Sequence, residues 1–238
     1  MKSPERISEP DDVVEPYGSE KIAAAIGKTP EEVAFIQKAV ASLEEEYGID
    51  EDSIGEKLLL FSHKLRQTFG SFANLKGKKI LDLGCGSTVS PKAEFLIQEL
   101  VAIRKQGGNV EKNPYYRELQ TLVPPEVDID FDTGAYSRLY EPWLDRLLVE
   151  LGAEPVGIDV GHLEGEKFTH HNVDLGKKGA LDFLPDHSFD GVHSKLLLCS
   201  PQMEVLGHAG AQKTIERELD AQTKRLLKPE GKVIDMFG

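Results

Sequence analysis

The sequence is poor in cysteine and has no long apolar segment. Cys85 and Cys199 are its only cysteines among 238 residues, too few for a disulfide framework or a four-thiolate zinc site. Because thiols are so sparse, a reducing compartment is the simplest assignment, and we expect a cytoplasmic protein. No stretch approaches the roughly 20 apolar residues of a membrane-spanning helix. The first residues are acidic and lack an apolar segment, so we expect neither a secretory signal nor a membrane partner.

The chain is also short of basic residues. Lysine and arginine together number 28, against 41 aspartates and glutamates, for a formal net charge of −13. A chain this acidic is repelled on average from phosphate backbones, which disfavours nucleic acid as a partner. We therefore expect a small molecule or a protein as the partner. Hydrophobic residues make up 39% of the chain, which is enough for a packed core at this length.

Helices are expected ahead of the main domain. We interpret residues 1–19 as a flexible acidic tail and residues 20–75 as a helical cap. Thr29, followed by proline and then by Glu32, is typical of a helix start, since the hydroxyl can cap the first turn. Apolar residues then recur at helical spacing as far as Gly48, and a second helical pattern follows it.

Strand and helix signals alternate from residue 76 onward. Short apolar segments between turn residues are expected to be strands, at 80–83, 155–159, 168–173, 189–193 and 232–236. The alternation predicts an α/β fold with a doubly wound, mostly parallel sheet of about five strands. We assign residues 76–238 to this domain and treat residues from about 90 to 136, which do not fit the alternation, as an insertion. Residues 228–231 are expected to form the turn before the fifth strand.

The strongest chemical signal is the segment ILDLGCGS at residues 80–87. Two glycines one residue apart, Gly84 and Gly86, allow the backbone to approach a ligand closely. A dinucleotide fingerprint needs a third glycine three positions later, where this chain has Val89. Asp82 at the strand end would repel a pyrophosphate, but it would attract an ammonium or sulfonium group. The segment therefore favours a cationic ligand lying across the strand ends.

This segment resembles the first motif of the class I S-adenosylmethionine-dependent methyltransferases, a family with a Rossmann-like fold. Later motifs match in the same order. Asp159 ends the second strand and Asp174 follows the third, while the sequences FDGV at 189–192 and LLKPEG at 226–231 resemble the fourth-strand motif and the turn before the fifth strand. The resemblance covers about residues 76–238 apart from the insertion. It implies S-adenosylmethionine as the cofactor and S-adenosylhomocysteine as its product.

The resemblance also implies a role for each matching residue. Asp82 and the two glycines would hold the methionine end, and Asp159 would accept hydrogen bonds from the ribose hydroxyls. Asp174 would accept from the adenine amino group, next to the backbone N–H of Leu175. The implied cofactor-binding residues are Asp82, Gly84, Cys85, Gly86, Ser87, Asp159, Val160, Asp174, Leu175 and His193.

Three features depart from the family pattern. The separation of Asp82 and Asp159 is several times the usual spacing of about twenty residues, and the insertion accounts for it. Thr88 stands where the family's loop has its third glycine, which puts the methionine-end contacts in doubt. The sheet is expected to lack the family's usual last two strands.

The residues that act on the methyl acceptor stay open at this point. His193, at the end of the fourth strand, is a candidate base, and the alternative is a histidine that is simply hydrogen-bonded there. Ser194, Ser200 and His208 lie in the same part of the chain. No metal is expected, because the adjacent pair His170 and His171 would face opposite sides of a strand.

We therefore expect a methyltransferase that acts on an unidentified small-molecule or protein acceptor. One alternative is a binding or regulatory protein that keeps the fold and the cofactor without chemistry. Another is a nicotinamide-dependent oxidoreductase, in which Asp159 would serve the NAD ribose, although Asp82 and Val89 speak against it.

Overall fold

The computed structural model describes most of the chain. The described residues are 26–27, 29–48, 51–124, 127–194, 206–208 and 210–234. The expectations for the acidic tail, for Cys199 and Ser200, and for Met236 in the fifth strand fall outside these residues.

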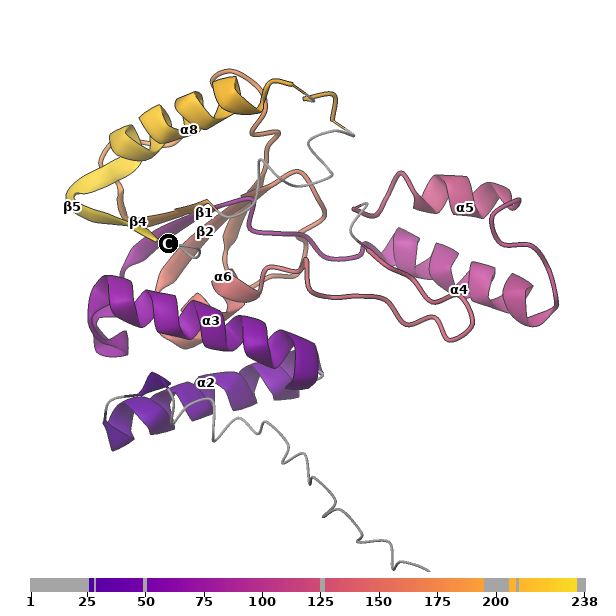
Figure 1. The fold of residues 1–238 in the computed structure, drawn as a ribbon, viewed down its shortest axis with the longest axis horizontal. Coiled ribbons are helices and arrows are strands. Elements are labelled where there is room, and N and C mark those ends of the chain that lie inside the picture. Colours follow the sequence, from indigo (N-terminus) through magenta and orange to yellow (C-terminus); the bar gives the residue numbers. More distant parts are fainter. Residues whose placement is uncertain are drawn as a thin grey trace, which may run out of the picture.

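A parallel sheet lies at the centre of the described part of the chain (Figure 1). Its five strands are β1 (Lys79–Leu83), β2 (Glu154–Asp159), β3 (Thr169–Asn172), β4 (Phe189–Ser194) and β5 (Leu227–Ile234). They lie in the order β3-β2-β1-β4-β5, and every neighbouring pair is parallel. The predicted α/β class and the parallel five-stranded sheet are thus confirmed, and the arrangement is compatible with a Rossmann-like fold.

The start of the last strand differs from the prediction. We expected a turn at residues 228–231, but β5 already begins at Leu227, directly after α8 (Gln212–Leu226). The pairing register shifts within the predicted turn, because Phe189 pairs with Leu227 whereas Gly191 pairs with Lys232. The proline and glycine that indicated a turn therefore lie in an irregular stretch of the strand itself.

Helices cover both faces of the sheet (Figure 1). The helices α2 (Pro30–Tyr47), α3 (Glu51–Phe69) and α6 (Trp143–Glu150) lie on one side, and α8 lies on the other. Because successive strand residues face opposite sides, Ile80 packs in the core of α2, α3 and α6, whereas Leu81 and Leu83 pack in the core that includes α8. Asp82 therefore shares the face that α6 covers.

The helical segment before the sheet begins and ends as its local sequence indicates. The Thr29 hydroxyl accepts a hydrogen bond from the backbone N–H of Glu32 at 3.2 Å. Gly48 closes α2 in the left-handed region, with φ of 60°. After α3, a short 3-10 helix (Phe72–Leu75) leads into β1.

The residues between β1 and α6 form a lobe beside the sheet (Figure 1). It contains α4 (Pro91–Lys105) and α5 (Pro114–Leu119), which pack on each other. The lobe has a hydrophobic cluster of its own, formed by Val89, Ala93, Leu96, Ile97, Leu100, Val101, Val110 and Leu119. No helix among the described residues is both long enough and apolar enough to cross a membrane.

Candidate functional site

The carboxyl ends of the strands form the candidate site. From β1 the chain continues to β2 and β3 on one side, and then returns to β4 and β5 on the other. Parallel α/β sheets bind ligands outside the carboxyl ends of the strands at the point where the strand order reverses. In this sheet that point lies between β1 and β4. Asp82 of β1 and His193 of β4 pair directly across this boundary.

Asp82 and His193 form a buried pair. The Asp82 Oδ1 atom lies 2.6 Å from His193 Nδ1, and the two residues are 1% and 3% exposed. The other ring nitrogen, His193 Nε2, is buried and has no hydrogen-bond partner. The structure thus brings together the two residues that the sequence assigned separately to the methionine end and to base catalysis. It gives His193 the strand-end hydrogen bond and leaves one ring nitrogen available.

Asp145 of α6 lies beside this pair and was missed by the sequence analysis. It is completely buried, and the Cys85 thiol, a weak donor, is the only hydrogen-bonding group beside its carboxyl oxygens among the described residues. Burial raises the pKa of Asp145 well above its ordinary value, and the nearby Asp82 and Glu166 raise it further. A neutral carboxylic acid is therefore the favoured form. A charged residue within the apolar run of this helix was the only local signal.

A glycine in β2 makes room for Asp145. A Cβ atom at Gly157 would lie 2.7 Å from the Cys85 sulfur, 2.9 Å from the Phe168 ring and 3.2 Å from Asp145 Oδ2. Cys85, which the resemblance implies for cofactor binding, packs in a small hydrophobic cluster with Leu163 and Phe168. Burial, and then the nearby Asp145, raise the pKa of the Cys85 thiol, which therefore stays protonated and is a poor nucleophile.

Asp159 at the end of β2 is bound to the backbone of the two neighbouring loops. Its Oδ2 accepts from the N–H of Gly86 at 3.1 Å, and its Oδ1 accepts from the N–H of Gly161 at 2.9 Å. Burial raises the pKa of Asp159, although these hydrogen bonds favour its charged form and oppose the shift. Each carboxylate oxygen keeps a further lone pair that can accept from a ligand hydroxyl.

The glycine-rich loop is explained by contacts within the protein. Gly86 has φ of +99°, and a Cβ there would lie 2.1 Å from the carbonyl oxygen of Tyr140. Ser87 is 2% exposed and packs against Gly161, where a Cβ would lie 2.3 Å from the serine hydroxyl. The backbone N–H of Thr88 donates to the carbonyl of His162 at 2.7 Å, which joins the loops after β1 and β2. In the structure, these small residues allow chain segments to approach one another.

The acid after β3 has a partner from far along the sequence. Asp174 Oδ1 lies 2.9 Å from His208 Nε2 and also accepts from the N–H of Gly176. A Cβ at Gly176 would lie 2.2 Å from the His208 ring, so this histidine packs against the turn that follows β3. Leu175 is buried in the core beside α8. His208, which the sequence placed near the acceptor, thus lies at the position implied for adenine.

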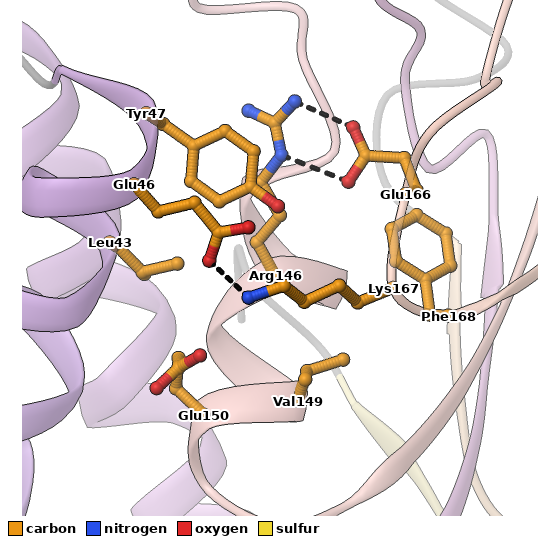
Figure 2. Close-up of a pocket in the computed structure, with 9 residues that line it drawn as sticks. All are labelled: Leu43, Glu46, Tyr47, Arg146, Val149, Glu150, Glu166, Lys167 and Phe168. Carbon is orange, nitrogen blue, oxygen red and sulfur yellow. Dashed lines mark hydrogen bonds and ion pairs between the residues drawn. The ribbon is translucent and has the colours of Figure 1, made fainter.

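A shallow hollow lies between α2, α6 and the segment before β3 (Figure 2). Arg146 and Glu166 meet there through two hydrogen bonds, and the guanidinium lies 4.0 Å from the centre of the Tyr47 ring. Phe168 directly precedes β3, and Glu150 ends α6 shortly before β2. The hollow therefore lies near the amino ends of β2 and β3, and two of its residues, Glu166 and Phe168, also lie close to Asp145 and Gly157.

Comparisons with known protein families, with curated proteins and with solved structures find no match for this chain. Among the described residues, no three histidine, cysteine or acidic side chains are grouped so that they could hold a metal ion.

Proposed function

We propose that the protein is an S-adenosylmethionine-dependent methyltransferase that acts on a small-molecule or protein acceptor. The observation that carries this proposal is the position of three acids at one edge of the sheet. Asp82 is in β1, Asp159 ends β2, and Asp174 follows β3 by two residues. Since these strands are parallel neighbours, their carboxyl ends meet at one edge, in the order of the three acids along the chain.

Each acid suits one part of this cofactor. A buried carboxylate at Asp82 attracts an ammonium group, and the free lone pairs of Asp159 suit two vicinal hydroxyls. Asp174 can accept from an exocyclic amino group once His208 moves aside. A pyrophosphate would instead face Asp82 and Asp159, which disfavours NAD. The unpartnered His193 Nε2 is a polar atom of the kind that a ligand can satisfy.

The cofactor would supply the reactive methyl group, and the chain would supply binding, alignment and removal of a proton. His193 is the candidate base, because Asp82 engages its Nδ1 and leaves Nε2 available. This is the relation between a carboxylate and an imidazole in many acid–base sites.

A binding or regulatory protein without chemistry is the second candidate. It is favoured by the bridge between Thr88 and His162 and by the close contact of Gly86 with Tyr140. The first contact joins the loops after β1 and β2, and the second holds the glycine-rich loop against the segment before α6. Turnover distinguishes this candidate from an enzyme, whereas binding alone does not.

Calorimetric titration with S-adenosylhomocysteine, with NADH as the control ligand, tests the proposal. We expect micromolar binding of S-adenosylhomocysteine alone. A screen of acceptors with radiolabelled S-adenosylmethionine then separates an enzyme from a binding protein. Binding of NADH alone would favour the oxidoreductase, and binding of neither ligand would refute both nucleotide-based assignments.

A further inference from the structure

Three ionisable side chains lie together under the carboxyl edge of the sheet. Asp145 on α6 lies against Gly157 of β2, Asp82 is on β1, and His193 is on β4. Gly157 and His193 are the register partners of Asp82 on its two sides, so Asp82 lies between the other two side chains. All three residues are at least 97% buried. We call them the buried triad.

The buried triad has unused hydrogen-bonding capacity. His193 Nε2 has no partner, and the Asp145 carboxyl group is next to only one weak donor, the Cys85 thiol. A buried polar atom without a strong partner destabilises the fold, so a group of such atoms in one place is unusual. The only contact that joins members of the triad at hydrogen-bonding distance is the 2.6 Å approach of Asp82 to His193.

Charge balance determines what a cation can do here. A buried carboxylate needs a counter-charge, and His193 is the one basic side chain in contact with Asp82 among the described residues. The other ionisable groups around Asp82 are Asp145, Asp159 and Cys85, and none of these supplies a positive charge.

We propose that the ammonium group of the ligand replaces the His193 proton as the counter-cation of Asp82, so that ligand binding releases one proton. This inference rests on the proposed function and adds to it the way in which the methionine end is recognised. The ammonium group binds the Asp82 carboxylate and balances its charge. The His193 imidazolium is then no longer needed as the counter-cation, and it loses one proton to solvent. The net charge of the buried triad and the bound ammonium group together equals that of the free triad.

The alternative proton source is Asp145. Ionisation of Asp145 would leave two carboxylates, the imidazolium and the ammonium buried together. Loss of the His193 proton leaves one carboxylate and one ammonium. Since every buried charge carries a desolvation cost, the second outcome is favoured, and Asp145 stays neutral as an acceptor beside the new cation.

Calorimetry measures the released proton directly. S-Adenosylhomocysteine is titrated at pH 6.0 in two buffers that differ in ionisation enthalpy, and the difference in apparent binding enthalpy gives the number of protons released. Adenosine, which lacks the ammonium group, is the control ligand and accounts for any exchange at the contact between His208 and Asp174. We expect S-adenosylhomocysteine to release about one proton more than adenosine. Over the pH range in which binding releases this proton, the affinity of S-adenosylhomocysteine relative to that of adenosine rises about tenfold per pH unit.

Variants assign the proton to one residue. His193→Asn should still bind S-adenosylhomocysteine but lose the excess proton, whereas Asp145→Asn should keep it. His63→Asn, at an exposed histidine on α3, is the matched control and should also keep it. Circular dichroism verifies that each variant is folded. If His193→Asn does not fold, NMR of the His193 ring in the wild-type protein, recorded with and without S-adenosylhomocysteine, shows whether the ring loses its proton.

The outcomes separate the two proposals. Failure of S-adenosylhomocysteine to bind refutes the proposed function and, with it, this inference. Binding with no excess proton overturns the inference alone. The same holds for an excess proton that persists in His193→Asn or disappears in Asp145→Asn.

Discussion

Replacement of Asp145 by asparagine should stabilise the protein increasingly as the pH rises. The native state holds this carboxyl group fully buried, next to Asp82 and Glu166, and its pKa is raised mainly by burial. The unfolded chain exposes the same group to water, where it ionises near pH 4. Between these two pKa values the unfolded state has lost the proton and the native state has kept it. Wild-type stability therefore falls as the pH rises, until the native pKa is reached.

The size of the effect follows from this linkage. Each pH unit between the unfolded and the native pKa of Asp145 lowers wild-type stability by about 1.4 kcal/mol. Asparagine has nearly the same shape and does not ionise, so Asp145→Asn avoids this loss. The advantage of the variant should grow by up to about 3 kcal/mol between pH 5 and pH 7.5.

Urea denaturation at these two pH values, followed by circular dichroism, measures the difference. Asp220→Asn, at an exposed position on α8, is the matched control, and its difference from wild type should not change with pH. Titrations elsewhere cancel because wild type and variant share them. An advantage of Asp145→Asn that is absent, or equal at both pH values, would show that the native carboxyl group is charged and compensated.

Three further predictions concern the site and its support. Asp159→Ala should weaken S-adenosylhomocysteine binding by about 2–4 kcal/mol in calorimetry, because a paired acceptor for the ribose is lost; near-normal affinity in a folded variant would place the ribose elsewhere. Arg146→Met should lower the free energy of unfolding by about 3–5 kcal/mol, because the buried Glu166 side chain loses its arginine partner and Glu141 keeps only Arg138; a neutral effect would contradict this role. Gly86→Ala should unfold at a lower urea concentration than Gly107→Ala. Both glycines have positive φ, but only a Cβ at Gly86 would clash with another segment, the backbone at Tyr140, so equal urea midpoints of unfolding would refute this contact.

Local sequence signals predicted the sheet well. The strands β1 and β2 are short apolar runs bounded by turn residues, whereas β3 has the polar sequence THHN and was predicted from the apolar residues on either side of it. The helix α2 starts directly after Thr29, whose side chain caps it. The prediction was wrong at residues 228–231, where proline and glycine indicated a turn. Lys228 binds Asp190 of β4 at 2.7 Å, a contact between separate elements that holds this stretch against the sheet. Local propensity carries no information about such a partner.

The candidate site was predicted less completely, because its contacts depend on strand register. Asp82 and His193 were each singled out, but their contact requires β4 to pair with β1 in one particular register. Asp174 and His208 likewise meet only in the folded chain. Asp145 was hidden by the pattern of its helix, because the leucines around it fully account for an amphipathic segment. The spacing of apolar residues shows which face of a helix is buried, but it does not show which polar residue is buried with it.

Asp145 links the stability and binding experiments. If it is neutral in the native state, Asp145→Asn becomes relatively more stable with rising pH, and the proton released by S-adenosylhomocysteine is unchanged. If it is charged, the stability advantage disappears, and the carboxylate becomes a second possible partner for the ligand's ammonium group. A charged Asp145 has no proton to give up, so His193→Asn would lose the excess proton in that case as well. The stability experiment therefore determines whether Asp145 carries a proton, and proton release by His193→Asn determines whether a neutral Asp145 gives that proton up when the ligand binds.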